Sequence, residues 1–169
     1  MKRFNLGSCV VTLCGLLCGA RNARAAVKGD FNGDGFSDLA IGVSDESVGS
    51  AHGAGAVNVI YGSASGLTAS GNQLWTQDSP GIQGLAEAGD HFGSALATGD
   101  FNNDGFADLA VGVPGEDVGS AQDAGAVNVI YGSASGLASA GNQLWDQNSS
   151  GSQDPAEAGD GFGYSFGVR

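Results

Sequence analysis

The chain has 169 residues and carries 18 acidic residues against 6 basic ones, which gives a formal net charge of −12 at pH 7. A surface of this sign repels nucleic acid and anionic lipid, so the composition excludes a nucleic-acid-binding protein. Six of the 18 acidic residues lie in two short loops, and carboxylates at such a density are tolerated better when cations lie between them.

Residues 1–25 have the features of a secretory signal peptide. Two basic residues precede an apolar run over residues 9–17, and Ala23-Arg24-Ala25 forms a cleavage site, so we expect cleavage after Ala25 and a secreted protein. The run is shorter than the roughly 20 residues that span a bilayer, and we expect no membrane span. A lipid-anchored form attached at Cys9 is less favoured, because Cys9 lies before most of the apolar run and not after it.

Removal of this segment would change the chemistry of what remains. All three cysteines (Cys9, Cys14 and Cys18) lie within it, so the mature chain could form no disulfide. Only Lys28 and Arg169 of the basic residues would remain beside all 18 acidic ones, and the net charge would become 2 minus 18, or −16.

The rest of the chain is a tandem repeat with a spacing of 70 residues. Residues 54–67 return unchanged as residues 124–137, and residues 30–99 match residues 100–169 at 46 of 70 positions. So many identities indicate that one structural unit is duplicated.

Each unit is expected to be an all-β propeller blade. Short β-type runs are separated by glycine, serine and asparagine clusters, and no stretch keeps a period of 3.6 residues. Four short antiparallel strands per repeat are typical of a propeller blade. In the second unit the predicted strands are 92–99, 108–113, 126–131 and 142–147.

A nine-residue loop is predicted between the first two strands of each unit. Residues 30–38 and 100–108 place aspartate or asparagine oxygens at positions 1, 3, 5 and 9 and glycine at position 6, which is what a calcium loop requires. The carbonyl at position 7 is the fifth expected ligand, and Mg²⁺ is less suitable because it demands compact octahedral geometry. The two predicted Ca²⁺ sites therefore use Asp30, Asn32, Asp34, Phe36 and Asp38, and Asp100, Asn102, Asp104, Phe106 and Asp108.

Other interpretations of this loop exist. An EF-hand needs glutamate at position 12, where this chain has Ile41 and Val111, and a dockerin would place helices after the loop. A plain turn, in which the side chains bond to their own backbone, needs no ion. If calcium does bind, we expect it to hold the hairpin and stabilise the fold instead of contacting a partner.

The second unit resembles the FG-GAP repeat of integrin α-subunit propellers and of many secreted bacterial proteins. The resemblance rests on Phe92-Gly93, on the run from Gly99 to Leu109 and on residues 111–114. It implies a calcium loop between the first two strands of each blade and a seven-bladed ring. The first copy departs from the pattern with Val43-Ser44, and residues 22–26 supply no Phe-Gly strand.

This resemblance divides the chain into three parts after the signal peptide. Residues 27–91 form a first repeat that lacks most of its first strand, residues 92–161 form a second repeat, and residues 162–169 form the first strand of a truncated third. Propellers need roughly four to eight blades, so two cannot close a ring. Further blades or another chain are needed, and an incomplete propeller is favoured over self-assembly.

The expected function is extracellular protein interaction or cell adhesion, without catalysis. The two histidines, His52 and His91, become Gln122 and Gly161 in the other copy, and no serine lies in a nucleophile elbow. The alternative is a non-catalytic propeller segment of a larger secreted hydrolase. The tryptophans that recur at one blade position, 75 and 145, favour packing between blades over sugar stacking, and residues 148–150 form a glycosylation sequon.

A partner is expected at the blade edge opposite the calcium loops. The loops there, residues 44–53 and 78–91 with their counterparts 114–123 and 148–161, differ most between the copies. This edge is acidic, so a cationic or metal-bridged partner is one hypothesis and a solvated surface is the other. Its carboxylates include Glu46, Glu87, Glu116, Asp117 and Glu157.

Overall fold

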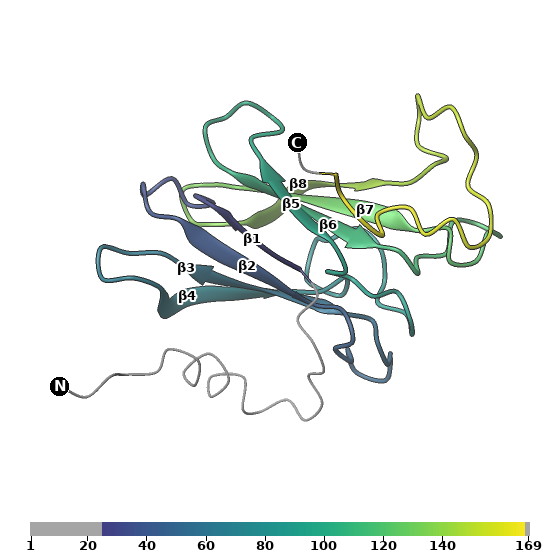
Figure 1. The fold of residues 1–169 in the computed structure, drawn as a ribbon, viewed down its shortest axis with the longest axis horizontal. Coiled ribbons are helices and arrows are strands. Elements are labelled where there is room, and N and C mark those ends of the chain that lie inside the picture. The colour runs from purple at the N-terminus through teal and green to yellow at the C-terminus, as the bar shows by residue number, and fades with distance from the viewer. Residues whose placement is uncertain (1–24, 168–169) are drawn as a thin grey trace.

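Each repeat folds into one antiparallel sheet whose four strands follow one another in chain order (Figure 1). The structure is a computed structural model and describes residues 25–167. The first sheet comprises β1 (Ala25–Gly29), β2 (Asp38–Val43), β3 (Ala56–Tyr61) and β4 (Thr68–Trp75). The second comprises β5 (Leu96–Gly99), β6 (Asp108–Val113), β7 (Ala126–Tyr131) and β8 (Ala138–Trp145). Residues 25–167 contain no helix, and hence none that could cross a membrane, and the all-β fold of two propeller-type blades is confirmed.

Strands β6 and β7 have the predicted bounds, whereas β5 and β8 differ from the prediction. The strand predicted from Phe92 begins only at Leu96, because Gly93 has a φ of 89° and the chain turns there. Phe92 instead forms a parallel bridge to Gly55 of the first repeat. The strand predicted over residues 142–147 spans 138–145, since Tyr131 pairs with Ala138 across a short turn.

The predicted strand at residues 162–169 does not form in its described part. Residues 162–167 contain no strand, and Phe162 makes a parallel bridge to Gly125, as Phe92 does to Gly55. In the second repeat, β5 is held in place by pairing with β6. Within residues 25–167, no strand follows residue 162 that could pair with this segment in the same way. At the other end, Ala25 already belongs to β1 and pairs with Gly42, while the rest of the predicted signal peptide lies outside the described residues.

The two sheets stack through unlike faces. Along β3, Val57, Val59 and Tyr61 are buried while the alternate positions are only half-buried. In β7 the buried side chains include one from the opposite face of the sheet. Ile130 is fully covered, whereas Val129, which corresponds to Val59, is only half-buried. The core between the sheets therefore combines Val57, Val59 and Tyr61 from one face of the first sheet with the opposite face of the second. That second face contributes Ile130 of β7 and Leu109, Val111 and Val113 of β6.

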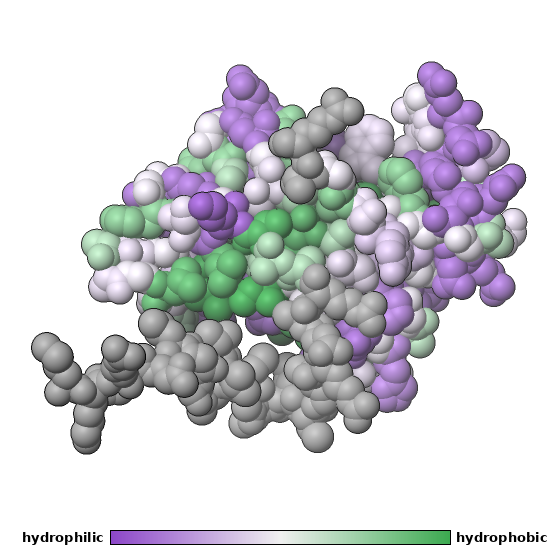
Figure 2. All heavy atoms as spheres, in the orientation of Figure 1, coloured by the Kyte–Doolittle hydropathy of each residue, from purple (hydrophilic) through white to green (hydrophobic). Residues whose placement is uncertain are grey.

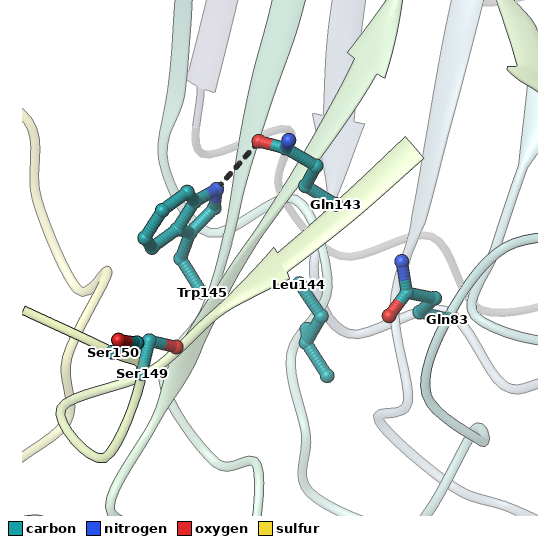
Figure 3. A pocket seen from close by; sticks show the side chains of 6 residues that line it. All are labelled: Gln83, Gln143, Leu144, Trp145, Ser149 and Ser150. Atoms are coloured by element: carbon teal, nitrogen blue, oxygen red, sulfur yellow. Dashed lines mark hydrogen bonds between the residues drawn. The ribbon is translucent and has the colours of Figure 1, made fainter. Parts of the chain in front are cut away.

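Each sheet therefore keeps one face that its neighbour does not cover. Trp75 on the covered face of the first sheet is 9% exposed, whereas Trp145 at the same place in the second sheet is 44% exposed. The prediction that tryptophan packs between blades thus agrees with Trp75. Trp145 instead lines a shallow hollow of about 330 Å³ with Gln143, Leu144 and residues of neighbouring loops (Figure 3).

Candidate calcium loops

The two aspartate-rich loops connect the first and second strands of each sheet, as predicted. The first closes where Gly29 pairs with Asp38, and the second where Gly99 pairs with Asp108. At position 6 the chain turns through a positive φ of 85° at Gly35 and of 92° at Gly105. Glycine adopts this conformation without steric cost, so it is the residue the turn requires.

In the first loop the predicted ligand oxygens face the loop's own N–H groups. Asp34 N donates to Asp30 Oδ1 at 3.0 Å and to Asn32 Oδ1 at 3.1 Å. Gly35 N donates to Asp30 Oδ2 at 2.9 Å, and Phe36 N donates to Asp34 Oδ1 at 2.9 Å. The side chains at positions 1, 3 and 5 therefore wrap around one short turn.

The second loop repeats these contacts. Asp104 N donates to Asp100 Oδ1 and to Asn102 Oδ1, both at 3.0 Å. Gly105 N donates to Asp100 Oδ2 at 3.0 Å, and Phe106 N to Asp104 Oδ1 at 2.9 Å. The two sequences thus build the same oxygen-lined turn twice, although position 4 is Gly33 in one loop and Asn103 in the other.

The aspartate at position 9 has a second role that the sequence pattern did not indicate. Asp38 accepts from Phe31 N and from Gly62 N, each at 2.8 Å, and Asp108 accepts from Phe101 N at 2.7 Å and from Gly132 N at 2.9 Å. Gly62 and Gly132 begin the connection between the third and fourth strands. Each buried aspartate therefore ties two neighbouring connections of its blade together, because one of its two donors lies 7 residues away and the other 24 residues away.

Negative charge accumulates around Asp38. Burial raises the pKa of its carboxyl group, and the carboxylates of Asp34 and Asp30 raise it further, while the N–H groups of Gly62 and Phe31 lower it. The three carboxylates are therefore close enough to repel one another. A cation placed among them would relieve that repulsion.

The loops meet some requirements of a calcium site and leave one open. The atoms predicted to bind the ion are all oxygens, which is the type of ligand that Ca²⁺ takes. Each carboxylate oxygen that accepts one N–H keeps a further lone pair, so the turn bonds and ion binding are compatible. Among residues 25–167, however, no three acidic, histidine or cysteine side chains converge closely enough to hold a metal.

The edge opposite the loops carries an acidic hollow of about 340 Å³ between the two sheets. Beside it, Gln77 Nε2 of the first repeat donates to Glu116 Oε2 of the second at 2.5 Å. Burial raises the pKa of Glu116 to about 7, the Gln77 hydrogen bond opposes this shift, and nearby carboxylates add to it. The acidic edge was predicted, but this contact between repeats was not, because its two residues are 39 positions apart. The hollow is lined by Glu87, Ala88, Asp90, Gly115, Asp117, Gln122 and Asp123.

Both histidines also lie on this edge. His52 Nδ1 is 3.2 Å from Ser47 Oγ within an exposed loop. His91 Nδ1 is 3.0 Å from the Ser44 carbonyl oxygen and 3.6 Å from Asp45 Oδ1. The His91 contacts join two neighbouring loops of the first repeat, whereas the His52 contact lies within one loop. Neither histidine recurs in the second repeat.

Comparison with known proteins agrees with this architecture. The FG-GAP repeat family model matches residues 22–60 and 92–130. The chain is 38% identical over 117 residues to phosphatidylinositol-glycan-specific phospholipase D of Rattus norvegicus and 42% identical over 120 residues to that of Homo sapiens. Each match covers 69% of this chain but only 14% of the phospholipase.

Integrin α-subunits are also similar. Integrin alpha-M of Mus musculus is 39% identical over 101 residues, which is 57% of this chain and 8% of the integrin. The chain thus corresponds to a small part of each relative, and that part is built from repeats of the kind described above. With both repeats matched by the family model and each folded as a four-stranded blade, the chain is an FG-GAP repeat protein.

Proposed function

We propose that this chain is a secreted, calcium-stabilised propeller module that interacts with an extracellular protein or a cell-surface ligand. The observation that carries the proposal is the pair of matching oxygen-lined loops, each at the same place in an FG-GAP blade. The similarity to integrin α-subunits supports the interaction role. Catalysis is not part of the proposed role, because the matched segment is only 14% of the phospholipases.

Calcium would act by stabilising the fold. In each loop the side chains at positions 1, 3, 5 and 9 and the carbonyl at position 7 would hold the ion, namely Asp30, Asn32, Asp34, Asp38 and Phe36, and their counterparts Asp100, Asn102, Asp104, Asp108 and Phe106. An ion that binds only the folded chain stabilises it by about 2.7 kcal/mol per site when its concentration is about 100 times Kd. The loop would then hold the first two strands of the blade together.

The partner would bind at the opposite edge. The connections there differ between the repeats, while the second and third strands and the calcium loops are nearly the same. Glu87, Asp90 and Asp117 line the hollow on this edge, so the partner surface would be cationic.

Thermal unfolding tests the role of calcium. We expect the midpoint to rise by about 5 °C or more between chelator and excess Ca²⁺, given the stabilisation expected per site. Excess Mg²⁺ should give a smaller rise. An equal midpoint in chelator and in calcium would contradict the proposal.

A matched set of variants separates the calcium site from a plain turn. Asp34→Asn and Asp104→Asn keep the oxygen that accepts from the N–H at position 7 but remove one negative charge. The double variant should lose most of the calcium-dependent rise. Asp154→Asn, which removes the same charge from an exposed loop, should keep it. If the wild type, the double variant and Asp154→Asn respond equally to calcium, the loops serve only as turns.

A second candidate function is the non-catalytic propeller segment of a larger secreted hydrolase. The similarity to a phospholipase favours it. The coding sequence on either side of this segment distinguishes the two: an adjoining catalytic domain supports the hydrolase, and further 70-residue units alone support the interaction module.

A further inference from the structure

The first aspartate-rich loop contains the one Asn-Gly pair of the chain, Asn32-Gly33, where the second loop has Asn102-Asn103. An asparagine amide is lost when the backbone nitrogen of the next residue attacks its Cγ atom. Glycine has no Cβ, so nothing on its own residue hinders this approach. The two loops thus present the same asparagine with and without an unhindered neighbour.

The structure leaves the attacking nitrogen of the first loop free. Among the residues that the structure describes, none accepts a hydrogen bond from Gly33 N or from Asn103 N. Both residues are exposed, with a φ of 70° at Gly33 and of 60° at Asn103. The loops lie at the surface, and hydrophilic residues gather at the tip of the one between β5 and β6 (Figure 2). The backbone at position 4 is therefore alike and accessible in both loops.

The three Asp-Gly pairs of residues 25–167 are protected, although aspartate can close the same ring with its next nitrogen. In each pair the glycine N–H donates to an oxygen elsewhere in the chain, and this bond must break before the nitrogen can attack. Gly33 is therefore the only glycine that follows asparagine or aspartate in this range and has a free N–H. The protecting bonds are Gly35 N to Asp30 Oδ2 at 2.9 Å, Gly105 N to Asp100 Oδ2 at 3.0 Å, and Gly161 N to the Asp123 carbonyl oxygen at 3.1 Å.

Packing between the loops favours glycine after Asn32. A Cβ atom at Gly33 would lie 2.6 Å from a ring carbon of Phe106 in the second loop. Another residue at this position would have to displace the ring, whereas Asn103 already carries a side chain at the corresponding place. The contact that excludes a side chain here also leaves Asn32 with its reactive neighbour.

The side-chain amide of Asn32 is held at both ends by Asp34. Asp34 N donates to Asn32 Oδ1 at 3.1 Å, and Asn32 Nδ2 donates to Asp34 Oδ2 at 3.0 Å. Negative charge develops on Oδ1 when a nitrogen attacks Cγ, and the Asp34 N–H is placed to stabilise it. Asn102 makes the same two contacts with Asp104, at 3.0 Å and 2.8 Å. Only the residue at position 4 distinguishes the two asparagines in this respect.

We propose that Asn32 is a site of spontaneous modification, at which the folded chain loses the side-chain amide while Asn102 keeps its own. The Gly33 nitrogen gives up its proton to the solvent and forms a bond to Asn32 Cγ. The Cγ–Nδ2 bond then breaks, the leaving nitrogen takes a proton from water, and ammonia departs from a succinimide ring. Water opens this ring at either carbonyl, which gives aspartate or isoaspartate. The overall change consumes one water and releases one ammonia.

The modification would make the two loops unlike. In the first loop it adds a carboxylate to those of Asp30, Asp34 and Asp38. In the isoaspartate product the backbone also runs through one more carbon atom, which displaces the oxygen that accepts from Asp34 N. The proposal does not depend on calcium binding or on the identity of a partner.

Peptide mapping by mass spectrometry tests the proposal on the full chain, incubated at neutral and at mildly alkaline pH in a buffer in which circular dichroism shows it folded. We expect most chains to lose the amide of Asn32 while the Asn102 peptide is still unmodified. The loss should be faster at the higher pH, because the attacking nitrogen must give up its proton. Retention of the Asn32 amide in the folded chain, or equal loss at Asn102, would overturn the proposal.

Two variants exchange the residue at position 4 and make the test specific. Asn103→Gly should make Asn102 lose its amide as readily as Asn32, and Gly33→Asn should protect Asn32 to the level of Asn102. Asn102 is exposed and Asn32 is half-buried, so earlier loss at Asn102 in the wild type would show that exposure decides and would contradict this account. If Gly33→Asn fails to fold, Asn103→Gly alone carries the comparison.

A denatured sample measures the contribution of the fold. In urea the three Asp-Gly pairs lose the bonds that protect them, so isoaspartate should form there as well as at Asn32. In the folded chain these pairs should stay unchanged over the same period. Chromatographic separation of the peptides detects isoaspartate, and equal formation at the Asp-Gly pairs with and without urea would contradict the protection assigned to the folded loops.

Discussion

The two tryptophans at positions 75 and 145 occupy the same place in nearly identical repeats, yet one is buried and the other exposed. The same holds for Phe31, which is fully covered, and Phe101, which is not. The sequence around each pair is nearly the same, so the difference comes from the neighbouring sheet. Burial in this repeat protein is therefore a property of the position in the array, which agrees with stability being a sum of repeat and interface contributions.

The largest expected effect comes from truncating the two tryptophans. Trp75→Ala should lower the free energy of unfolding by about 3–5 kcal/mol, because it removes a large side chain from the core between the sheets. Trp145→Ala should cost about 1 kcal/mol or less in the single chain, since its side chain is exposed. Chemical denaturation of dilute samples measures both. Equal losses would show that Trp145 is covered in solution.

A smaller effect should distinguish Glu46 from Glu116, which occupy the same place in the connection between the second and third strands of each blade. Glu116 is bonded to Gln77 across the sheets, and burial raises its pKa to about 7. Between pH 4.5 and 7 the folded chain keeps a proton on Glu116 that the unfolded chain has lost, so the free energy of unfolding falls as the pH rises through this window. We expect a fall of about 1–2 kcal/mol from this group, less than the full shift implies because the side chain is partly exposed to solvent.

Glu116→Gln should remove this part of the pH dependence. The control is Glu46→Gln, which changes the corresponding residue on the open face of the first sheet and should leave that contribution in place. Denaturant unfolding of the three chains at several pH values, in excess calcium, measures the difference. If Glu116→Gln follows the wild-type curve, the contact between the sheets does not hold the proton.

Comparison of these pairs also shows what the sequence could predict. The 70-residue spacing, the β-runs and the aspartate spacing were enough for the blade architecture, for β6 and β7, and for the position of both loops. The start of β8 was missed because Ala138, Ser139 and Ala140 have low β-propensity, and pairing with β7 makes them a strand. The prediction of a strand from Phe92 is wrong at its start, since the bridge from Phe92 to Gly55 is a contact between repeats that the local sequence does not reveal.

In the candidate site, too, the sequence predicted the local contacts and missed those between distant residues. The order of the aspartates predicted the loops, since those contacts are local. The bonds from Gly62 and Gly132 to the aspartates at position 9, and the bond from Gln77 to Glu116, join distant residues and became visible only in the fold. Calcium itself remains a prediction from the donor pattern.

The smallest expected effect concerns position 4 of the loops. A side chain at Gly33 would meet the Phe106 ring, with only 2.6 Å between its Cβ and the nearest ring carbon, whereas Asn103 already carries a side chain in the second loop. Gly33→Asn should therefore cost about 1 kcal/mol, because the ring must move. Asn103→Gly should stay within about 0.5 kcal/mol, since both residues accept a positive φ. Thermal midpoints in excess calcium measure the two, and equal changes would show that Phe106 does not crowd the first loop.

The most direct test of the proposed function is the stoichiometry of calcium binding, measured by isothermal titration calorimetry. We predict two ions per wild-type chain, one for Asp34→Asn, one for Asp104→Asn and none for the double variant, with one ion for each loop. No calcium binding by the folded wild-type chain, or the same stoichiometry in the double variant, would contradict the assignment of these loops as calcium sites.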